Sequence, residues 1–240
     1  MEGMEPKLDP RLIVALDFPE TAPALDLADR LAGHCRWFKV GLELYLAAGN
    51  AILHELRQRD FSVFLDLKLH DIPNTVARAV RSVAEIGAEL LTVHASGGPA
   101  MLAAAAEAAE AAPQGPQLLA VTVLTSMDRA QLAATGVADP PADQVLRLAE
   151  MAAGAGISGF VASAEETASL RRKLPSAILV IPGIRPAGAA SGDQKRTATP
   201  AAALAAGADY LVVGRPITQA ADPAAAAIAI LEEMQGVRAC

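Results

Sequence analysis

Short, almost wholly apolar segments alternate along this chain with longer segments in which apolar residues recur at helical spacing. A short continuous apolar run is typical of a strand buried on both faces, as in a parallel sheet covered by helices. We predict eight strands, at residues 12–16, 37–40, 61–65, 90–93, 118–123, 159–161, 178–181 and 210–213. The predicted helices lie between them, at residues 22–32, 42–59, 75–86, 98–112, 143–153, 164–173, 200–206 and 222–234.

Eight strand–helix units in 240 residues match an α/β fold of the (β/α)₈ type, the TIM barrel. A doubly wound open sheet is the alternative, because periodicity does not show whether the sheet closes. No linker or shift of composition marks a boundary, so we expect a single domain over residues 1–240, with residues 1–9 as an irregular N-terminal extension. Two connections after strands are long, at residues 125–143 and 182–200, and long loops in compact domains are often functional.

Composition removes several classes of function. The chain is 52% hydrophobic, which is ample for a core, and its net charge of −7 comes without any run rich in Lys and Arg. Nucleic-acid binding is therefore not expected, since it needs a basic surface. No apolar run approaches the ~18 residues that span a bilayer, so we expect no membrane segment. The short acidic N-terminus is unlike a secretion signal, and with only two cysteines in the chain it predicts a reduced, cytoplasmic protein.

Charged residues stand where the third predicted strand ends, in the stretch FLDLKLHD. Asp66 and Lys68 are two residues apart, so their side chains point to the same side of a strand. Asp71 lies in the following turn, where a helix-capping role is the simpler interpretation, and Lys39 ends the neighbouring strand. Ionised groups beside a core are costly unless they are paired or used, so this is either a local cluster of ion pairs or a reactive site.

Other polar residues follow the remaining strands, and a barrel would bring them all to one mouth. They are Asp17, His94, Thr125, Arg185, Gly214 and Arg215. Strand ends are exposed to water, which explains any one of these residues but explains the whole set poorly. Gly214 and Arg215 follow the last strand, where barrels often bind phosphate, and Gln194 on the preceding loop could add an amide donor.

The four charges Lys39, Asp66, Lys68 and Asp71 sum to zero and predict an alternating network. A substrate carboxylate held ~4 Å from Asp66 would be repelled by roughly 4 kcal/mol at an effective dielectric constant of about 20. Its departure as carbon dioxide would relieve that repulsion, and Lys68 could then protonate the carbanion. Lys39 and Lys68 would oppose a divalent cation, so we expect no metal. His70 is given no catalytic role.

The stretch DLKLHDIPNT resembles the D-x-K-x-x-D-I-x-x-T signature of the orotidine 5′-phosphate decarboxylase family in its bacterial form. Further blocks resemble that family in the same order along the chain: VALDF, FKVG, VLTS, PGIRP, GDQKR and VVGRPI. The resemblance covers most of the chain, from Asp17 to Arg215, with no departure at a motif position.

This resemblance implies a cofactor-free decarboxylation of orotidine 5′-monophosphate to uridine 5′-monophosphate, within pyrimidine biosynthesis. Lys68 would protonate carbon 6 of the pyrimidine, with Asp66 against the departing carboxylate. The remaining implied contacts are Asp17 and Lys39 to the ribose, Thr125 to the pyrimidine, Gln194 and Arg215 to the phosphate, and Arg185 on a closing loop.

The resemblance also implies a homodimer, in which Asp71, Ile72 and Thr75 reach the partner's active site. Three alternatives stay open. A related sugar-phosphate decarboxylase would use Mg²⁺ and carry an acidic residue where Lys39 stands. A phosphosugar epimerase would need metal ligands at the strand ends, and a barrel that only binds a nucleotide would not need Lys68.

Overall fold

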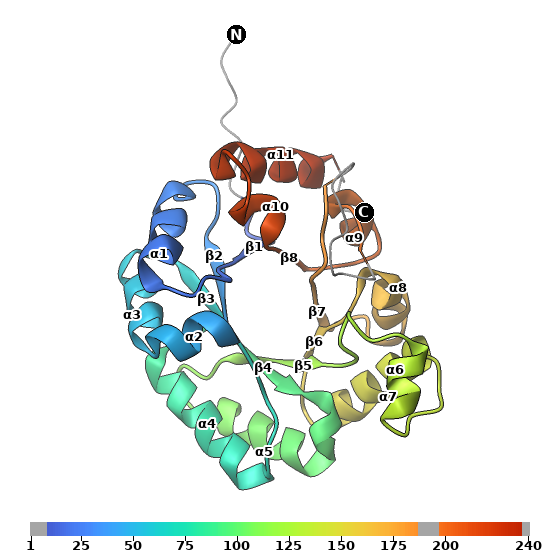
Figure 1. Cartoon of the computed structure of the whole chain (residues 1–240). Coiled ribbons are helices and arrows are strands. Elements are labelled where there is room, and N and C mark those ends of the chain that lie inside the picture. Colours follow the sequence, from blue (N-terminus) through green and yellow to red (C-terminus); the bar gives the residue numbers. More distant parts are fainter. Residues whose placement is uncertain (1–8, 187–196, 237–240) are drawn as a thin grey trace.

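The computed structural model describes residues 9–186 and 197–236. In this part of the chain eight parallel strands close into a barrel, because β1 (Leu12–Ala15) pairs on one side with β2 (Trp37–Gly41) and on the other with β8 (Tyr210–Val213). Figure 1 shows the helices arranged as a ring outside the strands. The closure confirms the predicted single-domain (β/α)₈ barrel and excludes the open doubly wound sheet.

The other strands follow in sequence order around the barrel. They are β3 (Ser62–Leu69), β4 (Leu90–His94), β5 (Gln117–Val121), β6 (Gly159–Val161) and β7 (Ile178–Ile181). The helices are α1 (Thr21–Arg30), α2 (Leu42–Ala48), α3 (Ala51–Gln58), α4 (Pro73–Ile86), α5 (Gly98–Glu110), α6 (Arg129–Ala134), α7 (Pro141–Gly154), α8 (Ala164–Lys173), α9 (Pro200–Ala205), α10 (Arg215–Thr218) and α11 (Pro223–Gln235), with a 3₁₀ turn at Ala95–Gly97.

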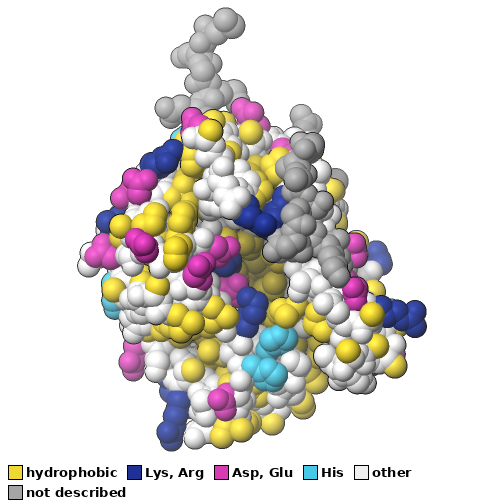
Figure 2. Space-filling model, in the orientation of Figure 1, with side chains coloured by type: hydrophobic (Ala, Val, Ile, Leu, Met, Phe, Trp, Pro, Cys, Tyr) yellow, Lys and Arg dark blue, Asp and Glu magenta, His cyan; other side chains and the backbone are white. Residues whose placement is uncertain are grey.

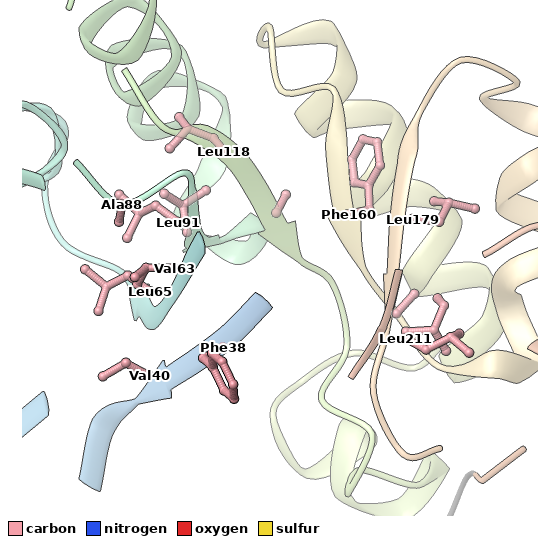
Figure 3. Close-up of a cluster of buried hydrophobic side chains, with 14 of the residues drawn as sticks. Phe38, Val40, Val63, Leu65, Ala88, Leu91, Leu118, Phe160, Leu179 and Leu211 are labelled. Atoms are coloured by element: carbon pink, nitrogen blue, oxygen red, sulfur yellow. The ribbon is translucent and has the colours of Figure 1, made fainter. Parts of the chain in front are cut away.

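Two apolar layers hold the barrel together, because successive side chains of a strand point to opposite faces. Ile13 lies in the inner layer with Phe64 and Val212, whereas its neighbours Leu12 and Val14 lie in the outer layer. The outer layer also contains the buried side chains of the helices, and Figure 3 shows part of it. The barrel interior is therefore a packed core and not a pore, which leaves the strand ends to form a site.

Three local features differ from the sequence prediction. The helix predicted over residues 42–59 is divided into α2 and α3, because Gly49 adopts a positive φ of 60° that helical residues do not have. The long connection after β5 contains α6, whose first turn is closed by a capping box between Asp128 and Gln131. Strand β3 continues to Leu69, four residues beyond its predicted end, because the polar residues there face the mouth of the barrel.

Just before the first strand, the buried Asp9 forms an ion pair with the half-buried Arg11. The carboxylate of Asp9 accepts hydrogen bonds from the guanidinium of Arg11, the shortest with an Nη2–Oδ2 distance of 2.7 Å. Residues 1–8 of the predicted N-terminal extension lie outside the described residues. In the part of the chain that the structure describes, no helix combines the length and apolarity needed to cross a membrane.

Candidate active site

The carboxyl ends of the strands surround a cavity of about 520 Å³, a size that suits a small-molecule ligand. Figure 2 looks onto this face and shows acidic and basic side chains around a hollow with a hydrophobic floor. Among the described residues, the cavity is lined by two carboxylates, Asp17 and Asp66, and by four cations, Lys39, Lys68, Arg185 and Arg215. The site is thus locally cationic although the whole chain carries −7, which favours an anionic ligand.

A chain of charges crosses one side of the cavity. The Lys68 Nζ atom lies 2.8 Å from Asp66 Oδ1, and Lys39 Nζ lies 3.6 Å from Asp66 Oδ2. Lys39 also donates to Asp17 Oδ1 at 3.1 Å. Gly41 leaves room for this bridge, because a methyl group there would lie 2.9 Å from Lys39 Nζ. The predicted proximity of Lys39, Asp66 and Lys68 is what the structure shows.

Asp66 is held ionised at the centre of this chain. Its side chain is 13% exposed, and burial by itself raises the pKa of a carboxyl group. The charges of Lys39 and Lys68, with hydrogen bonds from Lys68 and Thr92, outweigh that effect and hold the pKa of Asp66 below its ordinary value of 3.8. Asp66 therefore presents a permanent negative charge to anything that enters the cavity beside it.

Lys68 reaches the cavity from an unusual backbone conformation. Its φ is +51°, in the left-handed region that a residue with a side chain rarely occupies. The pairing of β3 with β4 shifts register here, from Leu65 opposite Leu91 to Leu69 opposite Val93. Such bulges are frequent beside active sites, where they redirect a side chain. Strain of this kind is also concentrated at functional sites, so the backbone marks Lys68 independently of its charge.

Two guanidinium groups lie at the other side of the cavity, next to the last strand. Arg215 begins α10 directly after Gly214, and Arg185 follows β7. Burial and the like charge of Arg215 both lower the pKa of Arg185. A bound phosphate dianion would relieve that repulsion and would accept hydrogen bonds from both side chains. The arrangement therefore supports the predicted phosphate site.

Comparison with known proteins decides the family. The model of the orotidine 5′-phosphate decarboxylase / HUMPS family matches residues 10–230. The chain belongs to this family. It is 56% identical to the orotidine 5′-phosphate decarboxylase of Halorhodospira halophila over 94% of this chain and 96% of that protein. It is 53% identical to the Pseudomonas putida enzyme over 94% of this chain and 97% of the relative.

A solved structure agrees with these relatives of the decarboxylase family. The orotidine 5′-phosphate decarboxylase of Lactobacillus acidophilus superposes with a TM-score of 0.84 at 39% sequence identity. The match covers 94% of this chain and 99% of that chain. The family membership predicted from the sequence motifs is confirmed, and it extends across the barrel and is not limited to the signature block.

Some family-signature residues lie outside the cavity of their own chain. Asp71, Ile72 and Thr75 stand at the start of α4 and are exposed, and Asp71 Oδ1 accepts a hydrogen bond from the Ile72 backbone N–H at 2.6 Å. The single chain therefore does not bring Asp71 into the charge network. Thr125 lies in the cavity wall, whereas Gln194 lies outside the described residues.

Sequence reasoning about the decarboxylase signature missed Thr92. This side chain is fully buried on β4, and its hydroxyl lies 2.9 Å from Asp66 Oδ1. A threonine inside an apolar run reads as an ordinary strand former. The available signal was the alternation of β4, in which Leu90 faces the barrel interior and Thr92, two residues further, faces the same side.

A pair of histidines stands beside Lys68 at the mouth of this decarboxylase-family barrel. The rings of His70 and His94 are stacked with centroids 5.4 Å apart, and His94 Nδ1 lies 2.9 Å from Ser96 Oγ. Burial is the main cause that lowers the pKa of His94, and the positive charges of His70 and Lys68 lower it further. His94 is therefore held in its neutral form near pH 7.

Proposed function

We propose that this chain decarboxylates orotidine 5′-monophosphate to uridine 5′-monophosphate as a step of pyrimidine biosynthesis, with Lys68 as the proton donor. The observation that carries the proposal is the buried Asp66 carboxylate, fixed between the ammonium groups of Lys39 and Lys68 in a cavity that has guanidinium groups at its far side. The choice of substrate is supported by relatives named orotidine 5′-phosphate decarboxylase, because the match to this chain covers 96% and 97% of their length. A cytoplasmic location, predicted from the sequence, fits such a role.

The proposed reaction begins with the substrate carboxylate placed against Asp66. Two carboxylates ~4 Å apart repel by roughly 4 kcal/mol at an effective dielectric constant of about 20. The bond between carbon 6 and the carboxyl carbon breaks, its electron pair stays on carbon 6, and carbon dioxide leaves. The Lys68 ammonium stabilises that negative charge and transfers one proton to carbon 6. The neutral amine then takes a proton from water, so the site returns to its starting state.

The phosphate, ribose and pyrimidine of the nucleotide would contact the other residues that line the cavity. We assign the phosphate to Arg215, Gly214 and Arg185, together with Gln194 by family resemblance alone. Asp17 and Lys39, joined at 3.1 Å, would hold the ribose hydroxyls. Thr125 would contact the pyrimidine. In this pose the phosphate is bound far from the reacting carbon, so its binding energy positions the carboxylate against Asp66.

We further propose that the functional unit is a homodimer. Ile72 is 66% exposed, which marks it as a candidate contact for another protein surface, and it stands between the polar motif residues Asp71 and Thr75. Leu42 and Leu46 on α2 are exposed as well, at 52% and 80%. Burial of these groups by a second copy would let Asp71, Ile72 and Thr75 enter the partner's cavity. There Asp71 would supply the second acid of the alternating network.

The same geometry favours a reaction that needs no metal. Both oxygens of Asp66 already face ammonium groups, since Lys68 lies 2.8 Å from Oδ1 and Lys39 lies 3.6 Å from Oδ2. A divalent cation would have to displace one lysine and would be repelled by the other. The sugar-phosphate branch of the family is the second candidate, and an acidic residue in place of Lys39 would have favoured it.

The deciding experiment is a spectrophotometric assay with purified protein, orotidine 5′-monophosphate and excess EDTA. Loss of the orotate absorbance is expected, with uridine 5′-monophosphate and carbon dioxide as the products. Loss that occurs only after Mg²⁺ is added would overturn the metal-free mechanism. No loss from folded protein under either condition would overturn the proposed substrate and direct attention to sugar phosphates.

A further inference from the structure

We propose that Thr92 is a positioning residue, whose hydroxyl couples the backbone of Lys68 to the carboxylate of Asp66 and holds both groups in the reacting geometry. The inference rests on the proposed function for its catalytic consequence. Its structural basis is independent of the substrate, because it depends only on the hydrogen bonds between β3 and β4. The residue is neither part of the quoted family motif nor a wall of the cavity, so it acts through its neighbours.

The direction of the hydrogen bonds around Thr92 is fixed by chemistry. The backbone N–H of Lys68 lies 2.8 Å from Thr92 Oγ1, and a backbone N–H can only donate. The hydroxyl has a single hydrogen, and its other near partner is Asp66 Oδ1 at 2.9 Å. Ionised Asp66 can only accept. The sequence of donors therefore runs from the Lys68 amide through the Thr92 hydroxyl to the Asp66 carboxylate.

The bulge in β3 explains why such a connection is needed. Leu65 pairs with Leu91 and Leu69 pairs with Val93, so the residues between Leu65 and Leu69 are opposite Thr92 alone. A backbone N–H that leaves the ladder in a buried position costs about 1–3 kcal/mol if it stays unsatisfied. The Thr92 hydroxyl supplies the missing acceptor at the residue whose φ is +51°, and so stabilises the bulge.

The same hydroxyl also determines how Asp66 meets Lys68. Asp66 Oδ1 receives two donors, Lys68 Nζ at 2.8 Å and Thr92 Oγ1 at 2.9 Å. Two donors at one oxygen fix the rotation of the carboxylate, and both lower its pKa. Without the hydroxyl, only the flexible ammonium groups of Lys39 and Lys68 would hold the carboxylate, so its rotation would be less restricted and its pKa would rise. The ammonium of Lys68 would then lose its defined position relative to carbon 6.

The test compares Thr92→Val with Thr92→Ser. Valine keeps the size and strand preference of threonine but has no hydroxyl, whereas serine keeps the hydroxyl. We expect Thr92→Val to lower kcat by roughly 10- to 100-fold with KM nearly unchanged, which is the range for loss of one outer-shell partner. Thr92→Ser should recover most of the activity. The phosphate and ribose contacts are untouched, which is why the effect should fall on kcat.

A matched control is Thr122→Val. Thr122 is also buried, lies just beyond the end of β5, and donates to the Val161 carbonyl at 3.1 Å instead of to the site. The Thr122→Val variant should lose stability as Thr92→Val does, but its kcat should remain that of the wild type. The pH profile separates the two further, because the acid limb of kcat/KM should move to higher pH only in Thr92→Val. If that variant does not fold, Thr92→Ala is measured in its place.

A ¹³C-NMR titration of Asp66 makes the inference independent of turnover. The carboxyl of Asp66 should titrate at higher pH in Thr92→Val than in the wild type. In Thr122→Val it should titrate at the same pH as in the wild type. An unchanged titration together with unchanged kcat would overturn the role of Thr92. If the wild type fails to consume orotidine 5′-monophosphate, the proposed function fails, but a shifted titration would still support the coupling of Thr92 to Asp66.

Discussion

Lys68 Nζ lies 2.8 Å from Asp66 Oδ1, and Lys68 makes this contact from a backbone with a φ of +51°. A left-handed conformation costs a residue with a side chain roughly 1–2 kcal/mol. The fold tolerates that cost at the residue that the proposed reaction needs most. Stability and function are therefore opposed at Lys68, and substitutions can separate them.

We expect Lys68→Ala and Lys68→Gly both to abolish turnover while the protein stays folded and still binds uridine 5′-monophosphate. Glycine adopts positive φ without strain, so the glycine variant should be more stable than the alanine variant by about 1 kcal/mol. Urea unfolding of the two variants measures that difference. Retained turnover in either would show that Lys68 is not the proton donor, and equal stabilities would show that the strain is relieved elsewhere.

The arginine side of the cavity gives a second prediction. Arg215→Ala removes a charged hydrogen-bond donor worth about 1.5–3 kcal/mol, so KM should rise by roughly 10- to 150-fold. Phosphite should partly restore the reaction of a substrate that lacks the phosphate group. The matched control is Arg172→Ala, since Arg172 is exposed on α8 and donates to Ser169. Equal effects of the two substitutions on KM would contradict the assignment of Arg215 to the phosphate site.

Gly41 provides a test of the Lys39 position. A methyl group at this residue would lie 2.9 Å from Lys39 Nζ and 3.4 Å from Asp17 Oδ1. The flexible ammonium can move aside, so Gly41→Ala should lower activity without a large loss of stability. We expect a rise in KM, because the Lys39–Asp17 pair is assigned to the ribose. Thermal unfolding and steady-state kinetics of the same preparation check both parts, and unchanged KM would contradict the assignment.

The sequence was sufficient for the barrel because its strands are buried on both faces. Such strands appear as continuous apolar runs, and the runs at β1 and β4 were placed within one or two residues of their observed ends. The end of β3 was misplaced because charge at Asp66 looked like the end of a strand. In a barrel, however, a strand can stay paired in the sheet at its carboxyl end while its charged side chains already face the mouth.

The centre of the candidate site was predictable because its residues carry charge. Ionised side chains at the ends of apolar strands are visible in the sequence, and they identified Lys39, Asp66 and Lys68. Thr92 was not identified in this way, because its role depends on a bulge that brings it opposite Lys68, and a register shift leaves no mark in composition. Asp71 also carries charge, but it lies exposed just before α4 and outside the cavity of the chain, so its charge alone did not predict its position.

The proposed dimer makes a prediction about mixed proteins. If Asp71 acts in the partner's cavity, Lys68→Ala and Asp71→Ala should each be inactive alone. Mixed under conditions that allow subunits to exchange, they should form heterodimers with one site that carries both substitutions and one site that is intact. Activity should therefore return on mixing.

The control for that mixture is Lys68→Ala mixed with Asp66→Ala, both of which affect the cavity of their own chain. No site in this mixture is intact, so no activity should return. Recovery in the control, or none in the Lys68 and Asp71 mixture, would contradict the shared site. Ile72→Asp should independently weaken the dimer, which sedimentation velocity would show as a shift toward monomer.

His94 predicts how stability depends on pH. Its pKa is lowered in the folded protein from an ordinary 6.5, chiefly by burial and then by the charges of His70 and Lys68. The unfolded chain therefore binds the proton more readily, and stability that is fully present above pH 6.5 should decline as the pH falls through the lowered pKa. Asp66 does not interfere, since its pKa is lowered from 3.8 and it stays ionised at pH 5.

We expect His94→Asn to flatten the decline in stability between pH 7 and pH 5, measured by urea unfolding. The control is His54→Asn, at an exposed residue of α3, which should leave that decline unchanged. A decline of equal size in both variants would mean that other groups govern the acid sensitivity of the fold.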